Sequence, residues 1–349
     1  MTLAQHVSLR PYNTFGVEAK ARWFASIRHS EDLIPLMQHE CWNGQRLVLG
    51  GGSNILFATD YEGLILHNQL TGVSIVEQDD ESVTLRVASG ENWHDLVCRC
   101  VASGWSGLEN LALIPGSVGA APIQNIGAYG AEFKDICRQV EFIYFDDGKK
   151  YIYEQQQCRF AYRDSVFKHE LHGRCFITAV TVKLSKRFRP NLSYGALKQF
   201  LESRRVIQPD LQQVFEAVVA LRKSKLPDPE QLGNAGSFFK NPVLAFQHAE
   251  RLRRQYSDLP VYLQGETAKI PAGWLIEQCG WKGRRLGQAG VYERQALVLV
   301  NHGGASGADL LELASRIQQS VYEKFGIWLE PEVNIIGSNG LVKKGPEGE

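Results

Sequence analysis

Residues 50–54, with the sequence Gly-Gly-Gly-Ser-Asn, form the first feature whose residue types could do chemistry. Glycines have no Cβ, so their backbone amides can surround an anion, and Ser53 and Asn54 add short polar groups. The chain then continues into an apolar extended run, residues 55–57, instead of the helix that a Rossmann fingerprint requires. The pattern favours a nest for a pyrophosphate, and a simple glycine-rich hairpin is the alternative.

A second glycine-rich loop follows at residues 114–130. Seven of the 16 residues from Pro115 to Gly130 are Gly or Ala, and most of the others are apolar. Such a loop lets the backbone pass close to a flat ligand while its amides donate to the ligand's heteroatoms. A tightly packed buried loop is the alternative. Two glycine loops, neither of Rossmann type, indicate a dinucleotide such as a flavin in a different fold.

The cysteines and histidines show no metal-ligand spacing. The seven cysteines include no CxxC pair, and Cys98 and Cys100 diverge on a helical pattern. The run from His169 to His172 lacks the HExxH spacing that places two imidazoles on one helix face. We expect no metal, and cysteines that act as small buried hydrophobes.

These loops must be positioned by a chain that alternates strands and helices. Apolar runs predict strands at 46–50, 54–57, 63–68, 73–77, 82–90, 140–146, 149–154 and 175–184. Spacings of three and four predict a helix at 91–103 that stops at Gly104, and another at 211–225 with Asp210 as its N-cap. The chain is therefore predicted to be α+β.

The PDPE stretch at 227–230 is a plausible domain boundary. Beyond it the pattern predicts helices near 243–255 and 272–279, a strand at 296–301 and a long helix that closes at Phe325 and Gly326. A last strand at 332–337 is expected to return to an earlier sheet, since alone it would be an unpaired edge.

Composition excludes several classes of protein. Of the 349 residues 44% are hydrophobic and 22% charged, which is typical of a globular chain of two or three domains. Lys plus Arg equals Asp plus Glu at 38 each, so no global attraction to nucleic acid is expected. Without a membrane span or a secretory signal, we expect a cytoplasmic protein that acts on small molecules and not at a membrane.

Seven motifs together carry a family resemblance. LGGGSNILF, GLENLALIPGSVGAAPIQNIGAYG, CRFAYRDSVFKHE, NAGSFFKNP, AGWLIEQCG, QALVLVN and WLEPEVNIIG occur in this order. The chain from Pro11 to Gly337 resembles the UDP-N-acetylenolpyruvoylglucosamine reductase family, FAD enzymes that complete UDP-N-acetylmuramate for peptidoglycan. The segment around Tyr194 resembles the longer type, which has an extra substrate-covering loop with a tyrosine.

The resemblance implies a two-part FAD-binding domain of the vanillyl-alcohol-oxidase type, at 1–70 and 71–226 with a returning strand in 328–349, and a smaller α+β substrate-binding domain at 227–327. It implies FAD as the cofactor. We expect the FAD to be bound non-covalently, because neither glycine loop contains a His or Cys that could form a covalent link. The implied cofactor-binding residues are Gly50, Gly51, Gly52, Ser53, Asn54, Pro115, Gly116, Ser117, Gly119, Ala120, Gln124, Asn125, Gly127, Ala128, Tyr129 and Gly130.

The resemblance also assigns the reacting groups. Arg163 would polarise the substrate, Ser237 would donate a proton, and Glu332 would be the acidic partner. Substrate contacts would come from Tyr162, Tyr194, Lys225, Asn241 and Gln295. Glu330 competes with Glu332, because strand alternation places both on one face.

The implied substrate is an enolpyruvyl ether, a double bond conjugated to a carboxylate. Hydride attack at its carbon 3 would push charge onto that carboxylate, where Arg163 is the candidate cation. Glu332 is then either protonated or orients the substrate through other groups. A Ser237 hydroxyl is a weak acid and needs a neighbour or ordered water. Lys225 would either assist Ser237 or bind the UDP phosphates.

NADPH is the implied hydride source, and no second dinucleotide motif exists. We therefore expect NADPH and substrate to use one pocket in turn, in a ping-pong scheme, in a protein expected to be a monomer. The alternatives are a related FAD-dependent oxidase and a non-catalytic nucleotide-sugar-binding protein. The lack of a covalent-flavin residue and the match at Ser237 disfavour the oxidase. The presence of both Arg163 and Ser237 disfavours the binding protein.

Overall fold

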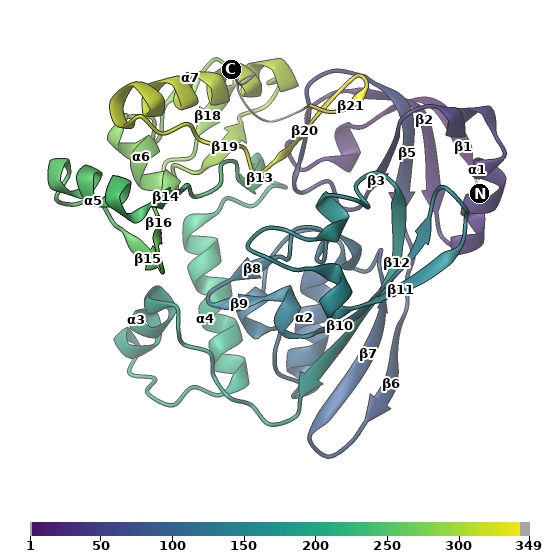
Figure 1. Ribbon diagram of the computed structural model, residues 1–349, viewed down its shortest axis with the longest axis horizontal. Helices are drawn as coiled ribbons and strands as arrows, with labels where there is room; N and C mark the ends of the chain where they lie inside the picture. Colours follow the sequence, from purple (N-terminus) through teal and green to yellow (C-terminus); the bar gives the residue numbers. More distant parts are fainter. Residues whose placement is uncertain (1, 343–349) are drawn as a thin grey trace. The chain divides into compact units, whose positions relative to one another are not determined.

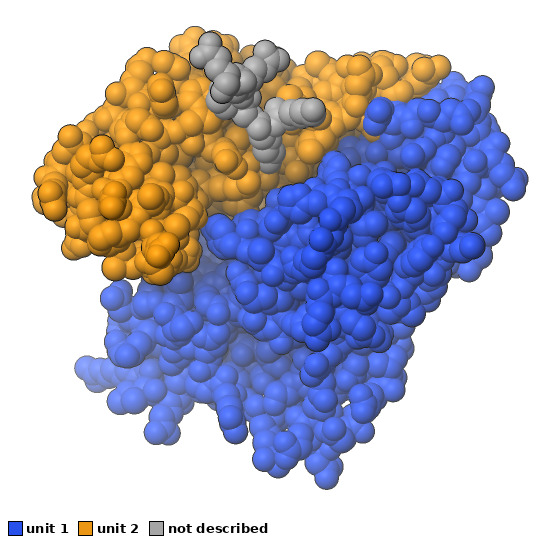
Figure 2. Space-filling view, in the orientation of Figure 1, with its two compact units in different colours: residues 1–5, 23–51, 63–224 blue, residues 6–22, 52–62, 225–349 orange. Residues whose placement is uncertain are grey.

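The computed structural model describes residues 2–342 and divides them into two compact units, each discontinuous in sequence. Unit 1 comprises residues 1–5, 23–51 and 63–224, and unit 2 comprises 6–22, 52–62 and 225–349 (Figure 2). Both contain helices and strands, so the predicted α+β class is confirmed. No helix among the described residues is long and apolar enough to cross a membrane.

Two sheets belong mostly to unit 1, although three strands of the first one include residues assigned to unit 2. A four-stranded sheet has the order β1-β2-β5-β3, and a five-stranded sheet has the order β11-β10-β12-β7-β6, whose strands lie side by side in Figure 1. Their strands are β1 (Leu3–Ser8), β2 (Lys20–Ile27), β3 (Arg46–Leu49), β5 (Tyr61–Asn68), β6 (Val73–Gln78), β7 (Ser82–Ala88), β10 (Cys137–Tyr144), β11 (Lys150–Glu154) and β12 (Cys175–Ser185). The predicted strands of this region are therefore confirmed.

Four helices and a small hairpin complete unit 1. They are α1 (Leu33–Met37), α2 (Trp93–Ala102), α3 (Gly195–Ser203), α4 (Leu211–Lys225), β8 (Gly127–Ala128) and β9 (Ala131–Glu132). Helix α2 begins where the Asn92 side chain accepts a hydrogen bond from the Asp95 amide, and its apolar face enters the core of the five-stranded sheet. Helix α4 has the predicted bounds and the predicted cap, since Asp210 Oδ1 accepts from the Gln213 amide at 2.8 Å. Helix α3 was not predicted.

Unit 2 has its own core, formed where helix α7 covers strands β18 and β19 (Figure 1). Its elements are β4 (Ile55–Phe57), β13 (Gly233–Ser237), β14 (Val243–Ala245), α5 (Phe246–Gln255), β15 (Tyr262–Gln264), β16 (Thr267–Lys269), α6 (Ala272–Gln278), β17 (Arg285–Leu286), β18 (Ala289–Val291), β19 (Val298–Asn301), α7 (Gly307–Phe325), β20 (Asn334–Gly337) and β21 (Gly340–Leu341). Helix α5 starts three residues later than predicted, because Val243–Ala245 pairs with β16.

The last strand returns to an early part of the chain, as predicted. Strand β20 pairs in parallel with β4, so that Ile335 lies opposite Leu56. It was expected beside residues 71–226, and that placement is wrong, because the fully buried β4 supplies the partner. The boundary between the units at 224/225 lies close to the predicted 226/227, and the functional division into three parts stays a prediction.

Candidate active site

The two glycine loops meet within unit 1. A Cβ added to Gly50 would lie 2.2 Å from Ser117 Oγ, and one added to Gly51 would lie 3.2 Å from the Gly116 Cα. Gly50 and Gly51 therefore leave room for the second loop, which a side chain at either position would crowd. This close backbone approach is the arrangement expected of a cradle for a phosphate-bearing ligand.

Replacing Gly51 with valine is expected to yield a folded protein that has lost most of its FAD. The new side chain crowds the second loop, at a cost of about 1–3 kcal/mol, which corresponds to roughly 5- to 150-fold weaker FAD binding. The absorbance ratio of flavin to protein in the purified variant measures the effect. Gly44→Val is the matched control, because a Cβ there meets nothing closer than 4.0 Å. Full flavin occupancy in Gly51→Val would contradict the assignment.

The remainder of the first loop belongs to unit 2. Gly52 adopts a φ of +61°, and a Cβ there would lie 2.0 Å from the Tyr12 carbonyl oxygen, so only glycine fits. The Asn54 carbonyl accepts hydrogen bonds from the main chain and side chain of Asn334, at 3.1 and 3.2 Å. Ser53 lies between these two fixed points. As predicted from sequence, the loop continues into a strand and not a helix.

The second loop is partly engaged with the protein itself. The amides of Val118, Gly119 and Ala120 donate to the carbonyls of Glu91, Ser89 and Ser117. The Asn125 side chain donates to the Ala161 carbonyl and to Glu132, and accepts from the Lys134 amide. These groups brace the loop, so the packed-loop alternative describes this part of it.

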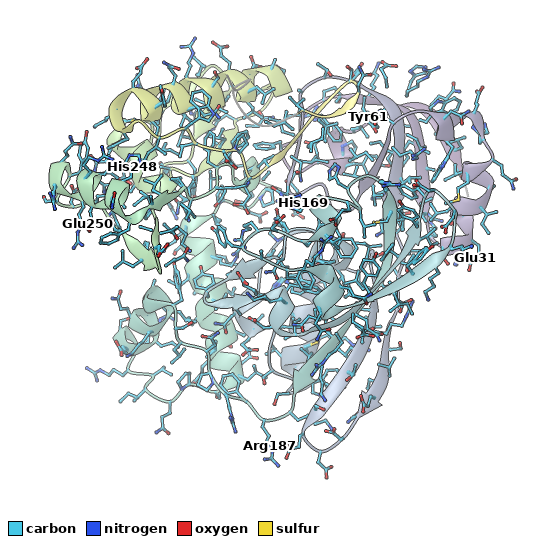
Figure 3. The ribbon with its side chains drawn as sticks, viewed as in Figure 1. Glu31, Tyr61, His169, Arg187, His248 and Glu250 are labelled. Carbon is cyan, nitrogen blue, oxygen red and sulfur yellow. The ribbon has the colours of Figure 1, made fainter. Side chains whose placement is uncertain are left out.

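Arg163 lies against the second loop. Its guanidinium donates to the Gly127 carbonyl at 2.9 Å, and its φ of +55° is uncommon for a residue with a side chain. The turn is closed by reciprocal hydrogen bonds between Ala161 and Asp164. Lys168 donates to the Arg163 carbonyl, and His169, labelled in Figure 3, pairs with Asp164 at 2.8 Å. The Asp164 carboxylate is thus paired with His169, while the Arg163 guanidinium binds the second glycine loop through the Gly127 carbonyl.

A second arginine near this turn was missed by the sequence reasoning. The Nε of Arg222, in helix α4, is shielded from solvent and has no hydrogen-bond partner among the described residues. Burial lowers the pKa of Arg222, the nearby charge of Arg163 lowers it further, and Tyr129 acts in the opposite direction. The shielded Nε makes Arg222 a candidate for binding an anion. From sequence, an arginine in a helix is normally interpreted as a solvated residue. Arg222 can therefore be recognised as a candidate site residue only from its surroundings in the structure.

The two predicted tyrosines are exposed. Tyr162 lies beside the Arg163 guanidinium, whose carbon is 5.5 Å from the ring centre. Tyr194 packs edge to face on Tyr129, with ring centres 5.2 Å apart. The structure therefore brings Arg163, Tyr162 and Tyr194 to the second glycine loop.

Ser237 is positioned in unit 2 by an irregularity in strand β13. The pairing of β13 with β19 shifts between Asn234 and Ser237, where Gly236 adopts a φ of +67°. The next residue, Phe238, is fully buried, and its carbonyl accepts from the Glu332 amide at 2.7 Å. Phe238 therefore holds Ser237 and Glu332 on neighbouring segments.

The structure distinguishes Glu332 from Glu330. Residues 330–332 form one isolated antiparallel bridge, between Pro331 and Phe239, and β20 starts only at Asn334, so strand alternation alone does not decide between the two glutamates. Glu330 is exposed and pairs with Lys240 at 3.0 Å, whereas Glu332 is partly buried beside Phe238. Pro331 has no N–H to donate, and the pairing around it is limited to this one bridge. Glu332 is the better candidate.

Asn241 and Gln295 converge on the start of helix α6. Asn241 Oδ1 accepts from the Ala272 amide at 2.9 Å, and Gln295 Oε1 lies 3.0 Å from where a Cβ of Gly273 would be. Gln295 also accepts from the Leu297 amide, and the Leu297 carbonyl accepts from Phe238. Lys225 is the last residue of α4. Unit 2 thus groups Ser237, Glu332, Asn241 and Gln295.

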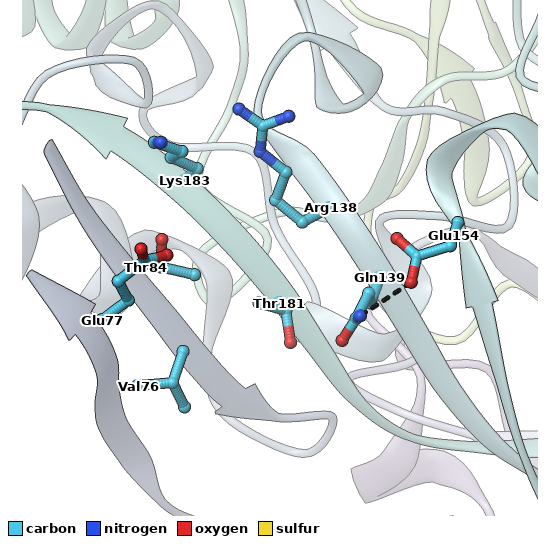
Figure 4. Close-up of a pocket in the computed structure, with 8 residues that line it drawn as sticks. All are labelled: Val76, Glu77, Thr84, Arg138, Gln139, Glu154, Thr181 and Lys183. Atoms are coloured by element: carbon cyan, nitrogen blue, oxygen red, sulfur yellow. Dashed lines mark hydrogen bonds between the residues drawn. The ribbon is translucent and has the colours of Figure 1, made fainter.

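An open depression of 620 Å³ lies on the five-stranded sheet, away from these groups. Figure 4 shows its polar lining, in which Gln139 donates to Glu154 at 2.8 Å. None of the predicted site residues lines it. Its lining carries charged groups of both signs, as is typical of a solvated sheet face.

Comparison with known proteins matches two regions of the chain, one that contains both glycine loops and one that contains Ser237. Residues 22–151 match the FAD binding domain, and 228–336 match the UDP-N-acetylenolpyruvoylglucosamine reductase C-terminal domain. The reductases of Chromobacterium violaceum and Flavobacterium johnsoniae are 49% and 44% identical, over 95% and 96% of this chain and 98% and 100% of theirs. The crystal structure of the Thermus caldophilus enzyme has a TM-score of 0.67 at 25% identity, and covers 96% of this chain and 98% of that one.

Proposed function

This chain belongs to the UDP-N-acetylenolpyruvoylglucosamine reductase family, and on that premise we propose how its residues perform the reaction. It is an FAD-dependent oxidoreductase that reduces the enolpyruvyl ether of UDP-N-acetylglucosamine in peptidoglycan precursor synthesis. The observation that carries the proposal is the placement of Arg163 on the second glycine loop.

The two glycine loops fit a flavin dinucleotide. Gly50 and Gly51 would face the pyrophosphate, and the 115–130 loop would line the ring system, because a side chain at these glycines has no room. When bound, FAD supplies hydride transfer from the reduced nicotinamide to the substrate. The protein contributes binding, orientation and the surrounding charges.

Arg163 would bind the substrate carboxylate. Negative charge grows on that carboxylate as carbon 3 is reduced, so a fixed guanidinium stabilises the transition state more than the ground state. Its hydrogen bond to the Gly127 carbonyl and its left-handed backbone fix its direction in advance. Arg222 would add a second positive charge to the same region.

Ser237 would then protonate carbon 2. The strand irregularity at Gly236 and the buried Phe238 hold the serine in one place, as proton transfer requires. Glu332 would orient the substrate or share the proton, since its main chain is tied to Phe238. Tyr162, Tyr194, Lys225, Asn241 and Gln295 would contact the sugar nucleotide.

An anaerobic titration tests this function. NADPH is expected to bleach the visible flavin spectrum of the holoenzyme, and the enolpyruvyl sugar nucleotide is expected to restore it stoichiometrically. Both steps should proceed without oxygen. If oxygen restores the flavin spectrum and the enolpyruvyl sugar nucleotide does not, the protein is an oxidase. If NADPH does not bleach the flavin, it is a binding protein. NADPH as the donor, action as a monomer away from membranes and a cytoplasmic location are part of this proposal.

A further inference from the structure

Asn110 connects two segments that the proposed function treats separately. It lies in a short 3-10 helix at Glu109–Leu111, and its side chain is 2% exposed. Its Nδ2 donates to the Tyr129 carbonyl at 2.8 Å and to the Asn191 carbonyl at 2.9 Å. One buried amide thus binds both the second glycine loop and the segment that leads to Tyr194.

A second link joins the same two segments at the surface. Asn191 Nδ2 donates to the Gly130 carbonyl at 3.0 Å, and its Oδ1 accepts from the amide and hydroxyl of Ser193. Gly130 adopts a φ of +85°, and a Cβ there would lie 2.2 Å from Ser193 Oγ. The Tyr129 and Tyr194 rings then pack edge to face. The backbone of the loop and the direction of Tyr194 are therefore fixed together.

We propose that Asn110 is a positioning residue that couples Tyr194 to the second glycine loop, so that Tyr194 contacts the sugar nucleotide only while the loop holds its flavin-binding conformation. The inference rests on the proposed substrate contact of Tyr194. Asn110 itself touches neither substrate nor cofactor in this scheme. Only an amide nitrogen can serve both carbonyls, because a carboxylate of the same shape has no donor.

A double-mutant cycle on the holoenzyme tests the coupling. Asn110→Ala is expected to raise KM for the enolpyruvyl sugar nucleotide roughly tenfold, which is typical of residues that share contacts, and to change kcat much less. Tyr194→Phe should also raise KM. The KM of the double variant should be no higher than that of Tyr194→Phe, because the Tyr194 hydroxyl that Asn110 would help to position is then absent.

Two further variants separate positioning from folding. Asn191→Asp lies at the surface and keeps the acceptor for Ser193, but replaces the donor to Gly130 with an oxygen that repels that carbonyl, so it should reproduce part of the KM increase. Asn301→Ala is the matched control, because the Asn301 amide is also buried and also donates to two carbonyls, of Phe15 and Ala305. It should lower the melting temperature without changing KM.

The outcomes distinguish the coupling from its premise. An unchanged KM in Tyr194→Phe removes Tyr194 from the substrate site and overturns its proposed role. If Tyr194→Phe raises KM and the increase from Asn110→Ala is fully retained in the double variant, the coupling alone is overturned. An unchanged KM in both Asn110→Ala and Asn191→Asp overturns it as well.

Discussion

Ser237→Ala is expected to lower turnover by about 10²–10⁴-fold, the usual contribution of general acid catalysis. The change removes one hydroxyl at the irregularity of β13 and hardly alters volume, so FAD binding and bleaching by NADPH should survive. Ser237→Cys keeps a transferable proton and should recover part of the loss. Steady-state turnover and the two half-reactions, followed by stopped-flow absorbance, measure these effects.

Isotopic labelling identifies the proton that Ser237 delivers. In deuterated solvent the wild-type product should carry one solvent deuteron at carbon 2 and one hydride from NADPH at carbon 3. The assignment fails if Ser237→Ala keeps more than about a tenth of wild-type turnover with unchanged solvent labelling, given the range expected of a general acid. Water or another residue would then be the donor.

Arg163→Ala is expected to divide the two half-reactions. Reduction of the flavin by NADPH should stay within a few-fold of normal, because the nicotinamide ring has no carboxylate for Arg163 to bind. Oxidation of the reduced flavin by the enolpyruvyl substrate should slow by roughly two decades or more, as expected for loss of the charge-assisted pair between Arg163 and the substrate carboxylate.

A matched arginine controls for the backbone of this variant. Arg159 also has a left-handed φ, of +47° against +55° for Arg163, but its side chain is 59% exposed and pairs with Glu170. Arg159→Ala therefore imposes the same backbone penalty without removing a site cation, and both half-reactions should remain normal. Equal losses in both half-reactions of Arg163→Ala would mean that Arg163 is structural or serves both ligands.

The predicted secondary structure agrees best with the observed one where a single run of residues determines the local conformation. Helix α4 has the predicted bounds because Asp210 caps an uninterrupted amphipathic run, and strand β4 is an apolar triplet that can only be buried. Helix α3 was missed because it buries only Leu197 and Leu201. The first residues expected in α5 form β14 instead, since pairing with β16 outweighs helical periodicity.

The site was predicted by resemblance more than by spacing. A lone arginine or serine cannot be recognised as a site residue from sequence. In the structure, Arg163 is distinguished by its left-handed backbone, and Ser237 by the strand irregularity beside it. Strand alternation does not separate Glu330 from Glu332, and only their different burial and partners in the structure distinguish them. Arg222 and Asn110 depend on contacts between distant segments, which no local pattern encodes.

The parallel pairing of β4 with β20 has a consequence for the synthesis of the chain. Asn54 and Asn334, joined by hydrogen bonds beside this pair, are 280 residues apart. At about 5–20 residues per second, a ribosome needs roughly 15–60 s to deliver the second strand after the first. Throughout that time Ile55, Leu56 and Phe57, all buried in the finished protein, have no partner strand. The nascent chain therefore carries an apolar segment without its partner strand until residues 334–337 have been made, and unit 2 can complete its fold only then.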